Sequence, residues 1–183
     1  MNSRLLSCVL LALGFASDAR AHRLDEYLQA TRVSVATNRI DLSIDLTPGV
    51  AVAGQLLDLI DTDRDGQVSK DETTAYAQRF LKDVRLALDE KVLTPSLVDA
   101  SFPALREIKE GLGVIRIKAS APVAQLTSGN HTLTLTNAHL PAISVYLVNA
   151  MAPKDRAIKI TKQTRDDLQR NYRMEFGITR QTP

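Results

Sequence analysis

The sequence predicts an α+β fold in which a helix–loop–helix unit is inserted into a two-sheet antiparallel β-sandwich. Two observations lead to this prediction. Short segments in which apolar and polar residues alternate recur about every ten residues along most of the chain, which is typical of strands joined by turns. Over residues 50–88, however, apolar residues recur at steps of three and four, which is the spacing of one face of a helix.

Length and composition indicate a single soluble domain. The chain has 183 residues, of which 44 % are hydrophobic and 24 % charged, and these values are ordinary for a globular protein with an apolar core. The formal net charge is +2, and no run or stripe of basic residues stands out, which argues against a nucleic-acid partner. Function is therefore expected to depend on particular sites and not on bulk charge.

The first residues have the features of a secretory signal peptide. Arg4 supplies a positive charge, residues 5–15 form an apolar run too short to span a bilayer, and residues 19–21 read Ala-Arg-Ala, a small-x-small cleavage site. We predict a signal peptide over residues 1–21 and a single β-sandwich domain over residues 22–179. This organisation predicts a protein that is periplasmic or secreted.

Cleavage of this segment would leave the mature chain without a covalent cross-link. Cys8 is the only cysteine and lies within the predicted signal peptide. A bound metal ion could then stabilise the exported protein in place of a disulfide. No other apolar run is long enough for a transmembrane helix, so we expect no transmembrane segment in the mature chain.

The first strands form a predicted β-hairpin. Apolar and polar residues alternate over residues 27–35 and again over residues 39–46, and Thr37-Asn38 between them is a turn signal. Pro48-Gly49 then ends the second strand and leads into the first helix. The helical insertion is therefore expected to leave the sandwich directly after this hairpin.

Two amphipathic helices are predicted on either side of a polar loop. The apolar face of the first is formed by Val50, Ala53, Leu56, Leu57 and Ile60. The buried stripe of the second is formed by Tyr76, Phe80, Val84 and Leu88. Ser69 is expected to cap the second helix, whose third residue is Glu72, a pairing that forms a capping box.

The loop between these helices, residues 61–72, carries oxygen ligands at regular positions. A cation of the size of calcium takes six to eight oxygen ligands, and the calcium loop of twelve residues supplies them from positions 1, 3, 5, 7, 9 and 12. The residues at those positions are Asp61, Asp63, Asp65, Gln67, Ser69 and Glu72. Gly66 occupies the sixth position, where the chain must turn sharply.

This loop and its flanking helices resemble an EF-hand. The resemblance implies Ca²⁺ as the cofactor, with three aspartate carboxylates, the Gln67 carbonyl, Ser69 and a bidentate Glu72 as ligands. It also implies an EF-hand insertion over residues 50–88. The alternative is an acidic surface turn that binds no ion. EF-hands usually occur in pairs, and since the sequence has no second loop of this kind, we expect one end or edge of the sandwich to cover the helices.

After the insertion, strand patterns resume. They cover residues 92–102, 114–119, the region of Leu133 and Leu135, residues 142–149, the region of Ile158 and Ile160, and the alternating residues Tyr172, Met174, Phe176 and Ile178. A short strand around Leu86 is joined to the first of these by a turn at Asp89-Glu90. Pro95 limits residues 92–102 to an edge or bulge, whereas residues 142–149, apolar on both faces, are predicted to be a central strand. About eight strands with this spacing favour an immunoglobulin-like sandwich.

The histidines support an alternative function. If cleavage follows Ala21, His22 has a free α-amino group, which together with its imidazole could chelate copper or nickel, with His131 or His139 completing the site. The simpler interpretation for His139 is structural, with a ring nitrogen that binds a backbone carbonyl. We found no nucleophile elbow, phosphate-binding loop or His-Glu-x-x-His motif, and we expect no enzymatic activity.

A second resemblance extends over most of the mature chain. Residues 21–29, 46–50 and 144–150, which read AHRLDEYLQ, LTPGV and SVYLVNA, are similar to exported bacterial domains that sometimes precede membrane segments of the nickel-permease type. The resemblance implies a periplasmic setting and metal-related physiology. We therefore expect an exported calcium-binding module with a protein partner at the cell envelope. The alternative is a transition-metal binder or permease accessory that uses His22.

Overall fold

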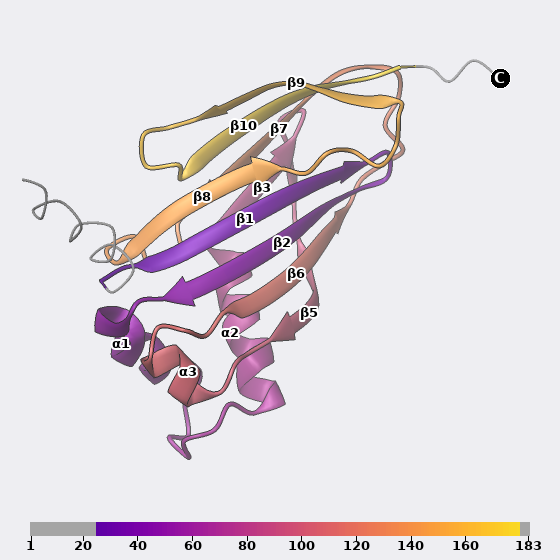
Figure 1. The fold of residues 1–183 in the computed structure, drawn as a ribbon. Coiled ribbons are helices and arrows are strands. Elements are labelled where there is room, and N and C mark those ends of the chain that lie inside the picture. The colour runs from indigo at the N-terminus through magenta and orange to yellow at the C-terminus, as the bar shows by residue number, and fades with distance from the viewer. Residues whose placement is uncertain (1–24, 180–183) are drawn as a thin grey trace, which may run out of the picture.

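Two five-stranded sheets enclose a common apolar core in the computed structural model, which describes residues 25–179 (Figure 1). The first sheet has the order β5 (Ser96–Ser101), β6 (Ile115–Pro122), β2 (Arg39–Pro48), β1 (Tyr27–Ala36) and β8 (Ser144–Ala150). The second has the order β4 (Lys91–Leu93), β3 (Val84–Leu88), β7 (Gly129–Asn137), β10 (Asn171–Ile178) and β9 (Ile158–Arg165). This arrangement agrees with the α+β sandwich class.

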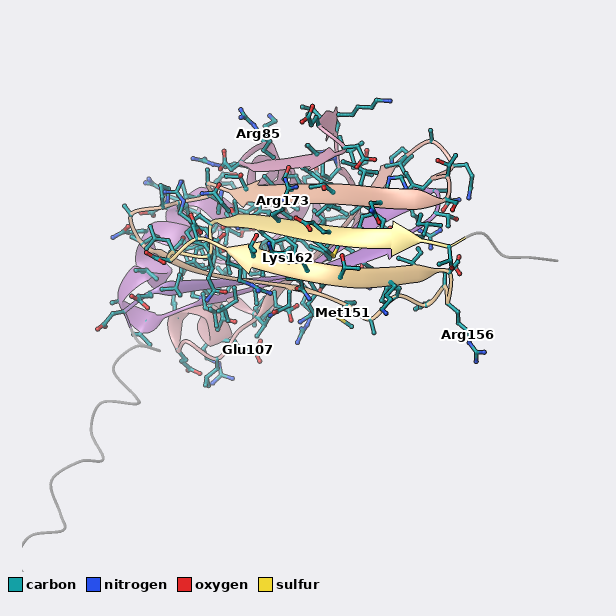
Figure 2. The ribbon with its side chains drawn as sticks, turned by 90° about the horizontal axis from the view of Figure 1, so that it is seen from above. Arg85, Glu107, Met151, Arg156, Lys162 and Arg173 are labelled. Atoms are coloured by element: carbon teal, nitrogen blue, oxygen red, sulfur yellow. The ribbon has the colours of Figure 1, made fainter. Side chains whose placement is uncertain are left out.

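Alternation of side chains builds the core between the sheets. On β2 every second residue from Ile40 to Leu46 is buried, and on β10 Tyr172, Met174 and Phe176 are buried in the same way. The residues between them face solvent. Figure 2 shows Arg85, Arg173 and Lys162 on the outer face of the second sheet. The predicted hairpin of β1 and β2 is confirmed, with Ala36 paired to Arg39 across the turn.

One strand lies elsewhere than the sequence predicts. Residues 142–149 were expected to form a central strand, but β8 is an edge strand that pairs only with β1, in parallel. Tyr146 and Val148 face the core, whereas Val145 and Leu147 are more than one-third exposed. The segment reads as apolar on both faces because Val145 and Leu147 stand on its outer face, although it does not lie between two other strands.

Three helices gather at one end of the sheets (Figure 1). They are α1 (Val50–Ile60), α2 (Lys70–Lys82) and α3 (Leu105–Lys109). α1 packs against α3, and α2 packs against β5. The loop between α1 and α2 projects from this end of the molecule, away from the sheets. Among the described residues, no helix is long and apolar enough to cross a membrane.

The predicted helical faces need two corrections. Val50 is 45 % exposed because it is the first residue of α1, and Val52 is buried in its place. The second helix ends at Lys82, so Val84 and Leu88 belong to β3. Their spacing of four residues suits a helix, but it also suits a strand, in which Val84, Leu86 and Leu88 all face the core.

The segment after Asp89-Glu90 divides at Pro95 into two strands. β4 pairs with β3 in the second sheet, and β5 pairs with β6 in the first. Pro95 lies between them and cannot donate to a strand ladder. Residues 25–179 therefore form ten strands where about eight were expected, and residues 91–101 cross from one sheet to the other.

Candidate metal centre

The loop between α1 and α2 turns sharply at two positions. Arg64 has φ 61° and Gly66 has φ 81°, both in the left-handed region. Glycine adopts this conformation at low cost, whereas a residue with a Cβ does not. These two turns fold residues 61–65 back on themselves, so that the side chains of alternate residues face one another.

The three aspartates of the loop converge. One carboxylate oxygen from each of Asp61, Asp63 and Asp65 lies within 4.8 Å of the other two. Oxygens that share one calcium ion lie about 2.3–2.6 Å from it, so any two of them are separated by no more than about 5.2 Å. The three carboxylates are therefore close enough to share a single ion.

Main-chain amides already hold one oxygen of each of these carboxylates. Asp61 Oδ2 accepts a hydrogen bond from the Gly66 N–H at 3.1 Å, and Asp63 Oδ1 accepts one from the Asp65 N–H at 3.2 Å. Asp65 Oδ1 accepts one from the Gln67 N–H at 2.7 Å. These bonds orient the carboxylates, and each side chain keeps a second oxygen for another ligand.

The second oxygen of Asp61 is an exception to the usual pairing of buried polar atoms. Asp61 Oδ1 is buried and has no hydrogen-bond partner in the described part of the chain. A buried carboxylate oxygen without a partner costs free energy, because it has lost its water and gained nothing in exchange. A cation in the loop would satisfy this atom.

Glu72 lies outside the group of three aspartates and joins the two ends of the loop instead. Its Oε1 accepts from the Thr62 N–H at 2.6 Å, and its Oε2 accepts from the Ser69 N–H at 2.9 Å. These donors, chiefly the Ser69 N–H, lower the pKa of Glu72 to about 2. Glu72 is therefore ionised at neutral pH, as a metal ligand must be.

Ser69 has the predicted capping role. Its hydroxyl oxygen accepts from the Glu72 N–H at 3.2 Å, and with the bonds from Ser69 to the Glu72 carboxylate this completes the capping box at the start of α2. Gln67 contributes an N–H to Asp65 in the same loop. The ligand roles of Gln67, Ser69 and Glu72 remain predictions.

A polar relay joins α2 to the sandwich, and all of its members are buried except Asp83, whose side chain is 43 % exposed. His139 is fully buried and lies between Tyr76 and Asp83, with Nε2 3.1 Å from the Tyr76 hydroxyl and Nδ1 2.8 Å from Asp83 Oδ2. The Tyr76 hydroxyl also lies 2.8 Å from the hydroxyl of Tyr27 on β1. We call Tyr27, Tyr76, His139 and Asp83 the tyrosine–histidine relay.

The relay has one consistent direction of hydrogen bonding. Burial lowers the pKa of His139, although its bond to Asp83 opposes the shift, so the ring is neutral at pH 7. A neutral ring that donates from Nδ1 to Asp83 accepts at Nε2 from Tyr76, which in turn accepts from Tyr27. All four side chains are satisfied in this arrangement.

The predicted structural role of His139 is confirmed only in part. Its ring nitrogens bind Tyr76 and Asp83, not a backbone carbonyl. The main-chain carbonyl of His139 is instead the acceptor that fixes the loop. Three side chains surround that carbonyl: Gln29 at 3.0 Å, Tyr146 at 2.9 Å and Ser144 at 3.2 Å.

His131 also has both ring nitrogens in use. Nδ1 lies 2.7 Å from Asp89 Oδ2, and Nε2 lies 3.0 Å from the Thr127 carbonyl. Both partners are acceptors, so only the protonated ring can donate to both. Partial burial favours the neutral form, but the bonds to Asp89 and Thr127 outweigh it and raise the pKa of His131. His22 lies outside the described residues.

The relay was not foreseen because its members are distant in the sequence. Tyr27 and Tyr76 are 49 residues apart, and Tyr76 and His139 are 63 apart. One local signal existed, because Gln29 is a polar residue on the inward face of β1, where it is fully buried. A polar side chain in such a position indicates a buried network.

Comparison with known proteins adds no assignment to this geometry. No protein-family model and no protein of curated function matches the chain.

Proposed function

We propose that this chain is an exported, periplasmic or secreted protein that binds one calcium ion in a single EF-hand inserted into an immunoglobulin-like sandwich. The observation that carries the proposal is the unpartnered, buried Oδ1 of Asp61 beside two further carboxylates within reach of the same ion. Three anionic groups in such proximity repel one another unless a cation neutralises them. Calcium supplies that charge and accepts oxygen ligands in irregular geometry.

The ligand set follows the order of the loop. Asp61, Asp63 and Asp65 would each provide the carboxylate oxygen that is not held by a main-chain amide. Gln67 would provide its main-chain carbonyl, Ser69 a contact through water, and Glu72 both carboxylate oxygens. Glu72 already lies at the closing end of the loop, and its lone pairs could serve the ion alongside the hydrogen bonds that hold it there.

A structural role for calcium fits the packing of α2 better than a sensory role. Val68 packs against the core directly before the helix, and Tyr76 and Phe80 are buried one and two turns after Glu72. The capping box forms among protein groups alone. The helix is therefore held in place at several points, and the ion would mainly order the loop between α1 and α2.

The stabilisation expected from such a site is modest. Extracellular calcium modules bind with Kd on the order of 10⁻⁴–10⁻³ M. A calcium concentration tenfold above Kd would stabilise the folded state by roughly 1.4 kcal/mol. For a protein of this size that corresponds to a rise in melting temperature of about 3–6 °C.

Thermal melts with calcium, with chelator and with copper test the proposal. Calcium should raise the midpoint, and Asp61→Asn should abolish the rise because it removes the charge of the carboxylate whose buried Oδ1 has no other partner in the described residues. Asp58→Asn is the matched control, since Asp58 is an exposed carboxylate of α1 outside the loop and should keep the full response. A midpoint that responds to copper but not to calcium would replace this proposal with the transition-metal function of His22.

A further inference from the structure

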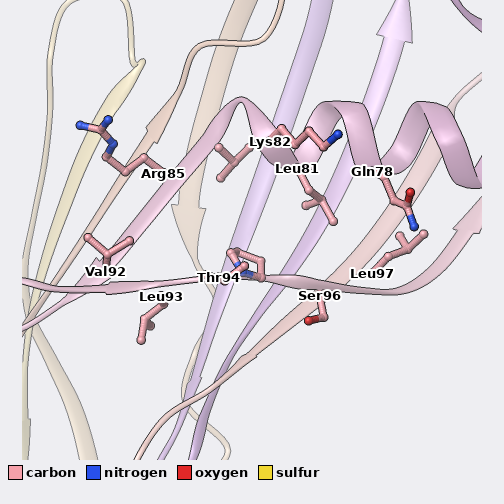
Figure 3. Close-up of a pocket in the computed structure, with 11 residues that line it drawn as sticks. Gln78, Leu81, Lys82, Arg85, Val92, Leu93, Thr94, Ser96 and Leu97 are labelled. Carbon is pink, nitrogen blue, oxygen red and sulfur yellow. The ribbon is translucent and has the colours of Figure 1, made fainter.

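A cleft opens on the side of the sandwich, where β3 and β4 separate. Their pairing runs from Leu88↔Lys91 to Leu86↔Leu93 and stops there. If the pairing of β3 with β4 continued in the same register, the next pair that faces the core would place Pro95 opposite Val84. Proline has no N–H to donate to this pair. The chain crosses to the first sheet at this point and leaves a cleft of about 650 Å³ between it and α2 (Figure 3).

The inner wall of this side cleft is apolar. Its apolar lining residues are Leu81, Val84, Val92, Leu93, Pro95 and Leu97. Leu81 and Val84 belong to the core of the protein, and Figure 3 shows Leu81 directed from α2 toward the crossing strand. Val92, 73 % exposed, is the most accessible apolar side chain of the cleft. The cleft therefore offers an apolar surface that continues into the core.

The rim of the side cleft is cationic. Lys82 and Arg85 stand beside it, and neither takes part in an ion pair within the described part of the chain. None of its lining residues is acidic. In Figure 3 the charged ends of Lys82 and Arg85 point away from the crossing strand, to the two sides of the α2–β3 junction, where they face solvent at the mouth of the cleft. A ligand with carboxylates would meet both charges without displacing an existing partner.

The backbone at the cleft favours an extended ligand. Leu88 and Lys91 flank the two-residue turn at Asp89-Glu90, so they form a hydrogen-bonded pair, and Leu86 and Leu93 form the next one. Val84 presents its main-chain groups on the same edge of β3, but it has no strand partner there. A peptide in extended conformation could use this edge while its alternate side chains enter the apolar cleft.

We propose that the side cleft is a docking site for an extended segment of a partner protein that carries alternating apolar and acidic side chains. This inference does not depend on calcium binding. The apolar wall selects the inward side chains, and Lys82 and Arg85 select the charge of the outward ones. A fatty acid would use the apolar wall and the two positive charges but not the edge of β3. Docking of a second copy of the chain would instead produce a dimer.

The probe is a fluorescein-labelled octapeptide of alternating leucine and glutamate, titrated with the purified protein by fluorescence anisotropy. We expect saturable binding, with a matching leucine–lysine octapeptide bound at least about tenfold more weakly. The double charge reversal Lys82→Glu with Arg85→Glu should also weaken binding about tenfold, because two exposed attractions become repulsions. Its matched control is Lys159→Glu with Lys162→Glu on β9, which should bind like the wild type.

Folding does not confound this comparison, because Lys82 and Arg85 are both exposed and unchanged melting curves verify that the variants fold. Val92→Ser, at another exposed position, should weaken binding through the apolar wall alone. Equal affinity for the two peptides, or full affinity in the Lys82/Arg85 double variant, would overturn the proposal. Displacement of the peptide by micromolar dodecanoate, or a dimer in sedimentation that the double variant abolishes, would assign the cleft to a lipid or to a second copy.

Discussion

Replacing Tyr76 with phenylalanine removes one hydroxyl from the middle of the tyrosine–histidine relay and leaves the ring in place. The hydroxyl is bonded to Tyr27 at 2.8 Å and to His139 Nε2 at 3.1 Å, and all three side chains are buried. In the variant, His139 Nε2 loses its donor and the Tyr27 hydroxyl loses its acceptor. Neither group has another hydrogen-bond partner in the described structure.

The magnitude follows from these two orphaned groups. A buried polar group left without a partner costs about 1–3 kcal/mol. Two such groups, partly relieved by small movements of the side chains, should lower the free energy of unfolding by about 2–4 kcal/mol. This corresponds to a fall in melting temperature of roughly 5–15 °C for a protein of this size.

Urea denaturation followed by circular dichroism measures this change. Tyr146→Phe is the matched control, because its hydroxyl donates to the His139 carbonyl, which keeps Gln29 as a donor. We expect this control to lose about 1 kcal/mol at most, the net value of one replaceable hydrogen bond. If Tyr76→Phe were no less stable than Tyr146→Phe, the relay would not be the buried, fully paired network described above.

Three further predictions concern the loop and the partly buried His131. The folded-state pKa of His131 is raised above its ordinary value of 6.5, so its contribution to stability is complete below pH 6.5 and is lost as the pH rises through the folded-state pKa. His131→Gln should remove this pH dependence of stability, measured by urea titrations at pH 5.5 and 8.5. An unchanged pH dependence in the variant would contradict the prediction. Ser69→Ala should cost about 0.5–2 kcal/mol in the same assay through loss of the cap of α2, whereas Ser96→Ala on the exposed edge strand β5 should be nearly neutral, and equal effects would refute the capping argument. Gly66→Ala should cost about 1 kcal/mol because φ is 81° there, while Gly54→Ala, inside α1 with free space around it, should stabilise; a neutral Gly66→Ala would show that the turn is not required.

The elements predicted best are those with one buried face and a local turn signal. The strands β1, β2 and β10 alternate strictly because one side packs in the core and the other meets solvent. The helix start at Ser69 was also readable, since the capping box requires only residues that are neighbours in the chain.

Other features depended on contacts that the sequence does not display. Val84 and Leu88 fit a helix and a strand equally well, and the pairing of β3 with β7, from Val84↔Asn137 to Leu88↔Leu133, decides between them. The edge position of β8 has no local signature either. Its outward main-chain groups are met by side chains of β9, with Arg165 donating to the Val148 carbonyl at 2.7 Å.

The candidate site likewise has features that the local sequence predicts and features that depend on long-range contacts. The positions of the aspartates, of Gly66 and of Ser69 follow from spacing alone, and the structure brings the three aspartates together. For Glu72 the sequence allowed two roles, capping and ligation, and the structure describes the first. The relay could not be predicted, because long-range packing of α2 against β1 and residue 139 creates it.

Isothermal titration of the purified, chelator-treated protein with calcium chloride tests most directly whether the loop from Asp61 to Glu72 binds one calcium ion. We predict one saturable site per chain with Kd on the order of 10⁻⁴–10⁻³ M, lost in Asp61→Asn and retained in Asp58→Asn. The absence of saturable binding at roughly ten times that concentration, or binding that Asp61→Asn leaves intact, would contradict the assignment.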